Sequence, residues 1–204
     1  MGGAAGEWRP TSQQLAEAAG RTIPDVIAPG LQVLFCGINP GLWSGAVGHH
    51  FARPGNRFWK VLAGAGFTDR VLSPFEERQL LDVGVGVTNL VARATAQAAE
   101  LTGDELRAGS RRLVAKVRRY RPACVAFVGL GAYRTAFGRP KATVGPLPDD
   151  VGPARGWLLP NPSGLQAHYQ LPDLVAAFGD LRHSLEPCSL DPSPDRPIAQ
   201  ISQE

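Results

Sequence analysis

The 204-residue sequence predicts an α/β fold, with a short, mostly parallel central β-sheet sandwiched between helices. Short apolar runs alternate with helical patterns along the chain. The 24 glycines and 18 prolines indicate many turns and argue against a bundle of long helices. With 44% hydrophobic residues, a chain of this length can bury one sizeable core but hardly two. We therefore expect one domain over residues 22–185, after a partly disordered N-terminal tail and lead-in (1–21) and before a proline-rich, disordered C-terminal tail (186–204).

Four segments are expected to be buried strands, because they are too short for helices and rich in β-branched and aromatic residues. In chain order they cover residues 32–36, 86–89, 123–128 and 156–159. Helix start signals stand between and after them: a Ser-Pro-Phe-Glu capping box at 73–76, Asn56 before a run of apolar residues, and a helical apolar period after Pro172. Strands separated by helices favour a parallel sheet covered on both faces.

The first and last of these strands run into two similar turns, GINPGL at 37–42 and PNPSGL at 160–165. Ligands of parallel sheets bind beyond the carboxyl ends of the strands, so both turns are expected at one functional edge. Asn39 is the first candidate residue there, since a carboxamide oxygen can orient a water molecule but has no useful proton affinity. An Asx-turn, in which the side chain bonds its own backbone, fits the sequence equally well.

The segment 48–59 (GHHFARPGNRFW) is a long loop that carries an aromatic ring, imidazoles and guanidiniums. Phe51 is either a plug of the core, which is the commoner role, or a stacking platform for a planar ligand. The adjacent His49 and His50 do not predict a metal site, because neighbouring side chains diverge and no third ligand lies at a suitable spacing. Arg53 and Arg57 are well placed to meet a phosphate backbone.

The formal net charge of +3 hides an uneven distribution, because the stretch 107–121 holds seven basic residues and no acid. On a helix, Leu113, Val117 and Tyr120 would face the sheet and Arg112, Lys116 and Arg119 would be exposed. A solvated face is the usual meaning of such a pattern, and phosphate contact is the less common one.

Other classes of protein are disfavoured by specific mismatches. The turn at 129–134 (GLGAYR) has an arginine where a dinucleotide fingerprint needs its third glycine, and Ser44 is one position late for a nucleophile elbow. Cys36, Cys124 and Cys188 form no CxxC pair and are expected to be reduced thiols, the first two buried. Neither a leader-like N-terminus nor a membrane-spanning apolar run is present in the sequence, so we expect a cytoplasmic, nucleoid-associated protein.

Five motifs in this order resemble the mismatch-specific uracil-DNA and thymine-DNA glycosylases, a branch of the uracil-DNA glycosylase superfamily. They are GINPGL, GHHF, PGNRFW, GVTNLV and NPSGL, and the likeness extends from about residue 22 to residue 185. It implies a three-layer α/β/α fold and a monofunctional enzyme of base excision repair, active as a monomer and without metal or cofactor. The implied partner is double-stranded DNA, and the implied reaction is hydrolysis of the N-glycosidic bond of uracil, thymine or another damaged pyrimidine mispaired with guanine.

The resemblance also assigns residues. Asn39 matches the catalytic asparagine, which positions a water for attack on the deoxyribose C1′, and Asn89 is expected to assist either the placement of that water or the binding of the base. The implied base pocket consists of Ile38, Ser44, His50 and Phe51, with Phe51 stacked on the extruded base.

Contacts to DNA are implied for Arg53, Arg57 and the NPSGL loop. In that loop Asn161, Ser163, Gly164 and Leu165 match the segment that enters the duplex, with Leu165 as the wedge. The HisHis pair resembles the thymine branch and NPSGL the bacterial uracil branch, which leaves the preferred base open. The alternatives are a non-catalytic module that binds mismatched DNA and, less favoured, a nucleotide-binding α/β enzyme.

Overall fold

The computed structural model describes residues 9–164 and 168–186, and its centre is a five-stranded sheet with the order β2-β1-β3-β5-β4. Strands β1 (Val33–Gly37), β2 (Val85–Asn89), β3 (Cys124–Val128) and β5 (Arg155–Leu159) run parallel, and the short β4 (Gly145–Pro146) pairs antiparallel with β5. The four predicted strands are confirmed, with their ends shifted by single residues. The sequence does not predict β4, because two residues with a proline carry no alternation.

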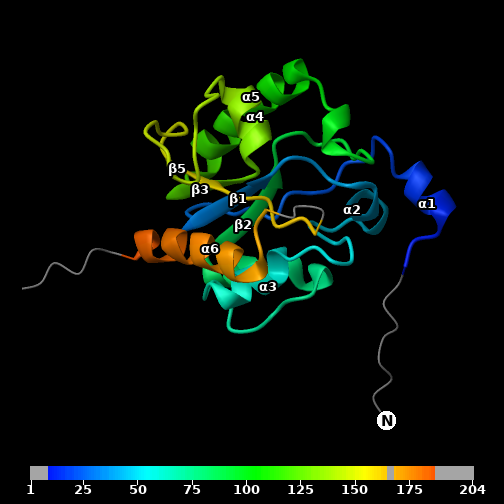
Figure 1. Cartoon of the computed structure of the whole chain (residues 1–204), viewed down its shortest axis with the longest axis horizontal. Helices are drawn as coiled ribbons and strands as arrows, with labels where there is room; N and C mark the ends of the chain where they lie inside the picture. Colours follow the sequence, from blue (N-terminus) through cyan, green and yellow to red (C-terminus); the bar gives the residue numbers. More distant parts are fainter. Residues whose placement is uncertain (1–8, 165–167, 187–204) are drawn as a thin grey trace, which may run out of the picture.

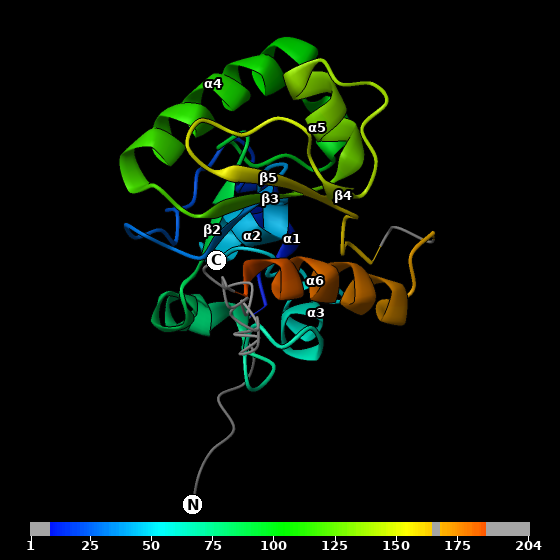
Figure 2. The same ribbon diagram turned by 90° about the vertical axis from the view of Figure 1, so that its left-hand side faces the viewer.

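Helices cover both faces of the sheet and give the predicted three layers (Figures 1 and 2). α4 (Gly103–Tyr120) and α5 (Leu130–Phe137) lie on one face, above the sheet in Figure 2. α3 (Phe58–Gly64) and α6 (Leu171–Leu185) lie on the other, together with the 3₁₀ helix η1 (Pro74–Val83). Two apolar cores result, one on each side of the sheet.

The central strand β1 supplies side chains to both cores, since successive residues of a strand point to opposite faces. Val33 and Phe35 belong to the core under α3 and α6, whereas Leu34 and Cys36 belong to the core under α4 and α5. All four are at most 2% exposed. β1 is therefore fixed by packing on both faces as well as by pairing with β2 and β3.

Three short helices have no counterpart among the predicted elements: α1 (Ser12–Glu17), α2 (Leu42–Val47) and η2 (Ala98–Glu100). α1 lies within the segment expected to be a tail and lead-in, and a capping box of Thr11 with Gln14 starts it. It packs against α2. Both tails are expected to be disordered, and residues 1–8 and 187–204 of these tails lie outside the described residues.

The capping box at Ser73 is confirmed, but the helix it starts is 3₁₀. Ser73 Oγ accepts a hydrogen bond from the Phe75 N–H, and Glu76 Oε2 accepts one from the Ser73 N–H. Glu77 and Leu80 are the buried residues of η1. Their spacing of three places both on one face of a helix with three residues per turn, which favours the 3₁₀ geometry.

The predicted faces of α4 are right except at Lys116. Leu113 and Val117 are buried, Tyr120 is partly buried, and Arg112 and Arg119 are exposed. Lys116 is half-buried because its Nζ lies 2.5 Å from Asp25 Oδ2 and donates to Thr88 Oγ1 at 2.9 Å. A lysine with this pair available reaches inward along its apolar stem instead of extending into solvent.

Cys36 and Cys124 are buried free thiols, as predicted, and burial raises the pKa of each to about 12. Among residues 9–164 and 168–186, no helix combines the length and the apolar character needed to cross a membrane.

Candidate active site

The carboxyl ends of the parallel strands bring the expected turns together at one edge of the sheet. The register pairs Gly37 with Asn89, so the segment that leads to Asn39 starts beside the end of β2. Asn161 follows β5 at the same edge and lines the same cavity as Asn39 and Asn89. The two Asn-Pro turns, 122 residues apart in the chain, therefore meet as predicted.

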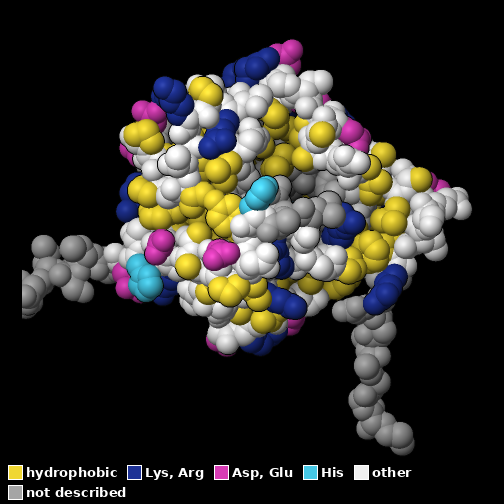
Figure 3. Space-filling view, in the orientation of Figure 1, with side chains coloured by type: hydrophobic (Ala, Val, Ile, Leu, Met, Phe, Trp, Pro, Cys, Tyr) yellow, Lys and Arg dark blue, Asp and Glu magenta, His cyan; other side chains and the backbone are white. Residues whose placement is uncertain are grey.

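The cavity at this edge has a volume of about 670 Å³, in the range of small-molecule sites. Figure 3 shows the corresponding face of the molecule hollowed beside its centre and bordered by hydrophobic side chains. Among the described residues that line the cavity, His50 and Arg53 are the ones with titratable side chains, and no carboxylate is among them. The predicted site residues found in the lining are Ile38, Asn39, Ser44, His50, Phe51, Arg53, Asn89, Asn161 and Ser163.

Asn39 is held through its amide nitrogen. Nδ2 donates to the Arg93 carbonyl at 3.0 Å and to Thr95 Oγ1 at 2.8 Å. Nothing among the described residues donates to Asn39 Oδ1, and the side chain makes no Asx-turn with its own backbone. The amide is thus fixed in one orientation, with its acceptor oxygen left available at the cavity.

His50 and Asn89 form a hydrogen-bonded pair in the wall of the cavity. His50 Nε2 lies 3.0 Å from the Pro24 carbonyl, which can only accept, so Nε2 carries the proton and Nδ1 is the acceptor. Asn89 Nδ2 donates to that Nδ1 at 3.2 Å. Burial lowers the pKa of His50 below its usual value, against the opposing influence of Glu77, and favours the neutral ring that this tautomer requires.

The same pair fixes the direction of the Asn89 oxygen. With Nδ2 bound to His50, Oδ1 faces Gly37, where a Cβ on that glycine would come within 2.6 Å of it. No described residue donates to this oxygen. Asn89 thereby presents a hydrogen-bond acceptor to the cavity.

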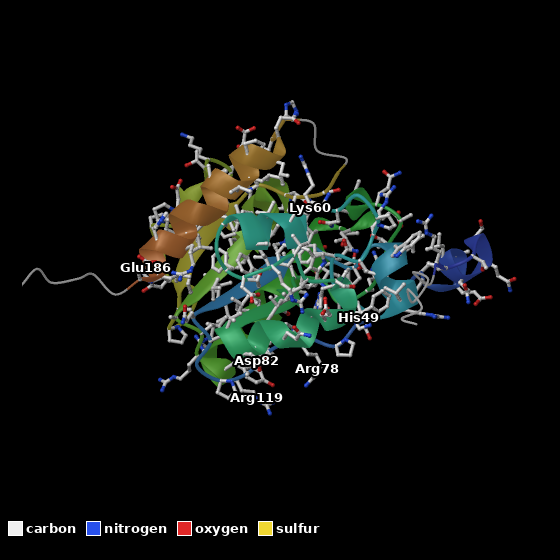
Figure 4. All side chains as sticks on the ribbon, turned by 90° about the horizontal axis from the view of Figure 1, so that it is seen from below. His49, Lys60, Arg78, Asp82, Arg119 and Glu186 are labelled. Atoms are coloured by element: carbon white, nitrogen blue, oxygen red, sulfur yellow. The ribbon has the colours of Figure 1, made fainter. Side chains whose placement is uncertain are left out.

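Glu77 of η1 organises the loop that carries Phe51. Its Oε1 lies 2.9 Å from His49 Nδ1 and its Oε2 accepts from the His50 N–H at 2.8 Å, with Glu77 only 5% exposed. Figure 4 shows His49 beside the η1 helix, and the His49 ring also contacts Phe75. The sequence does not predict this role, because Glu77 simply follows Glu76, the acid of the capping box, and belongs to no motif.

Phe51 proves to be both a core residue and a wall of the cavity. Its ring stacks on Phe58 at a centroid distance of 3.9 Å and an angle of 21°, and it also lines the cavity. The backbone of Phe51 is left-handed, with φ 50°, an uncommon conformation for a bulky residue that the surrounding contacts must hold. Ser44 supports the next residue, because its Oγ accepts from the Ala52 N–H at 3.2 Å.

The two arginines of the loop differ. Arg53 is exposed at the cavity, whereas Arg57 is partly buried and its guanidinium donates to the carbonyls of Pro162, Ser163 and Tyr169. Gly164 is exposed next to this contact but does not line the cavity, and Leu165 lies outside the described residues.

Sequence reasoning missed the supports of the site. Thr95 and Pro24 belong to no motif, and their roles depend on loop contacts that periodicity cannot reveal. Within the described residues, no three His, Cys, Asp or Glu side chains are grouped so that they could hold a metal ion.

Known proteins resemble this chain in family and in fold. The model of the uracil DNA glycosylase superfamily matches residues 24–182, which include all five strands and the edge of the sheet where the cavity lies. The solution NMR structure of a proposed uracil DNA glycosylase from Methanosarcina acetivorans is similar in fold, with a TM-score of 0.54 at 18% identity over 80% of this chain and 99% of that chain. The chain therefore belongs to the uracil DNA glycosylase superfamily.

Proposed function

We propose that this protein is a monofunctional DNA glycosylase of base excision repair that hydrolyses the N-glycosidic bond of uracil paired with guanine in double-stranded DNA. The observation that carries the proposal is the state of Asn39, whose amide nitrogen is held by Arg93 and Thr95 while Oδ1 has no donor among the described residues. A fixed, neutral acceptor suits the placement of a water molecule opposite a departing base.

The chemistry asks for placement more than for proton transfer. The C1′–N bond breaks with its electron pair passing to the base, an oxocarbenium-like sugar forms, and the water oxygen bonds to C1′ and releases a proton to solvent. The Phe51 N–H has no acceptor among the described residues and belongs to a residue of the cavity lining, so it is suited to stabilise the departing anion. The described lining contains no carboxylate that would repel this anion.

Base selection is attributed to Phe51 and Asn89. The Phe51 ring offers a face for stacking, and Asn89 Oδ1 offers an acceptor for the imide N–H of uracil or thymine. Cytosine has no hydrogen at that ring nitrogen, so it would leave the oxygen unpaired and bind less well. Extrusion of a mispaired base costs less than extrusion of a paired one, which favours U opposite G over U opposite A.

Hydrolysis without a covalent intermediate is supported by the positions of the lysines. The sequence has three, Lys60, Lys116 and Lys141, and none of them lines the cavity. Lys116 is committed to Asp25, and the other two are exposed on the surface. A Schiff base with the deoxyribose would need a lysine amine at C1′.

The test is base release from labelled duplexes that contain G·U, G·T, A·U or G·C pairs, followed by alkaline cleavage at abasic sites. We expect cleavage first at G·U and none at G·C, and a loss of about a hundredfold or more in Asn39→Ala with binding retained. Wild-type protein that binds the G·U duplex but releases no base would be a binding module instead. Trapping of the protein on DNA by borohydride would contradict the monofunctional assignment.

A further inference from the structure

Arg57, near the end of the 48–59 loop, makes several hydrogen bonds to the turn after β5 and to the chain that follows it. The Arg57 Nε donates to the Pro162 carbonyl at 3.2 Å, Nη2 to the Ser163 carbonyl at 2.9 Å, and Nη1 to the Tyr169 carbonyl at 2.6 Å. The Arg57 backbone N–H donates to the Pro162 carbonyl as well, at 3.1 Å. Arg57 thus forms hydrogen bonds to the chain on both sides of the segment 164–168.

Two features of the turn permit these hydrogen bonds with Arg57. Asn161 Oδ1 accepts from the Ser163 N–H at 3.0 Å, which closes the turn. Gly164 lies so near the other loop that a Cβ on it would come within 2.7 Å of the Gly55 carbonyl. Asn161 and Ser163 line the cavity, so the position of the turn sets one wall of the site.

We infer that Arg57 is a positioning residue, which fixes the 161–164 turn against the N-terminus of α3 and thereby places Asn161 and Ser163 at the substrate. The inference rests on the proposed glycosylase function and deepens it, because it gives the two arginines of one loop different tasks. Arg53, exposed at the cavity, is the one placed to meet a DNA phosphate, whereas the planar fork of Arg57 is engaged with three backbone carbonyls.

A lysine at position 57 separates the two possible tasks. It keeps the positive charge but cannot reach three carbonyls with a fork, so it serves as a phosphate contact and fails as a positioning group. The slope of log K for DNA binding against log salt is negative, and loss of one phosphate contact reduces its magnitude by about 0.9. Loss of positioning leaves that slope unchanged and lowers the rate of the bound complex.

The experiment measures Arg57→Lys, Arg57→Met and Arg53→Met, with Arg78→Met as the control, since Arg78 is exposed on η1 and labelled in Figure 4. For a G·U duplex we expect both Arg57 variants to lose roughly ten- to hundredfold in the single-turnover rate at saturating enzyme, with the wild-type salt slope. Arg53→Met is expected to reduce the magnitude of the salt slope by about 0.9, and Arg78→Met to match the wild type.

A second readout needs no catalysis. Amide hydrogen exchange in the free protein should be at least about tenfold faster at Ser163 and at residue 57 in both Arg57 variants than in the wild type, with Arg78→Met unchanged. Wild-type exchange at Ser163 in Arg57→Lys, or a wild-type excision rate together with a shallower salt slope in Arg57→Met, would overturn the assignment. If the wild-type protein releases no base, the proposed function fails, and the exchange rates still decide the role of Arg57.

Discussion

Replacement of Thr95 by valine tests whether the orientation of Asn39 controls the reaction. Thr95 is 3% exposed, and its Oγ1 accepts from Asn39 Nδ2 at 2.8 Å while donating to the Gln97 carbonyl at 2.8 Å. Valine has nearly the same shape but no hydroxyl, so Asn39 would keep only the Arg93 carbonyl, at 3.0 Å, as an acceptor. The amide could then turn away from the orientation that leaves Oδ1 at the cavity.

The expected loss follows from one hydrogen bond of the two. A net contribution of about 0.5–1.5 kcal/mol, if it appears wholly in the activation barrier, slows base release by about two- to twelvefold. Thr95→Ser keeps the hydroxyl and should stay within about twofold of the wild type. Asn39→Ala removes the oxygen itself and should cost far more than Thr95→Val.

The assay is single-turnover release of uracil from a G·U duplex at saturating enzyme, so that binding does not enter the rate. Wild-type speed in Thr95→Val, or equal slowing in Thr95→Ser and Thr95→Val, would refute the reasoning. A Thr95→Val variant as slow as Asn39→Ala would also refute it, because Thr95 would then do more than orient the amide.

Three further outcomes are expected. Gly37→Ala should displace the Asn89 oxygen, which would lie 2.6 Å from the added Cβ. The free energy of unfolding in urea should fall by about 1–3 kcal/mol, and base release should slow. A variant as stable and as active as the wild type would contradict this. Because burial lowers the pKa of His50, the unfolded chain binds a proton that the folded protein does not. The free energy of unfolding should therefore fall as the pH drops below about 6.5, by at most about 1.4 kcal/mol per pH unit. In His50→Gln this pH dependence should be shallower between pH 7 and 5, and an identical dependence argues against the neutral ring. Lys116→Met should lower the free energy of unfolding by about 1–3 kcal/mol, because it leaves Asp25 without its cation. The double variant with Asp25→Asn should lose less than the sum of the losses of the two single variants, and strict additivity would exclude the coupling.

The sequence could predict the strands and the edge where the site lies, because both depend on local pattern and on the geometry of parallel sheets. It could not decide between an Asx-turn and a free oxygen at Asn39, since the partners of that amide come from residues 93 and 95, in a loop without a motif. The two roles weighed for Phe51 turn out to be compatible, because one ring contacts Phe58 and also borders the cavity.

Lys116 and η1 show the other limit. Helical periodicity alone predicts that Lys116 is exposed, but its pair with Asp25, which lies 91 residues earlier in the chain, draws the side chain inward. The 3₁₀ geometry of η1 likewise depends on Glu77 turning inward to the His49–His50 loop, a tertiary contact that the capping box does not encode.

The position of β1 in the sheet has a consequence for how such a site can change. Asn39 lies two residues beyond a strand that is paired on both sides and packed on both faces, so the backbone that carries the group proposed to place the water has little freedom to shift. Asn161 and Phe51 sit on loops whose positions rest on a few side chains, among them Arg57 and Glu77. Under the proposed function, a new target base can therefore arise through exchanges in the loops alone, while the strand that leads to Asn39 stays unchanged.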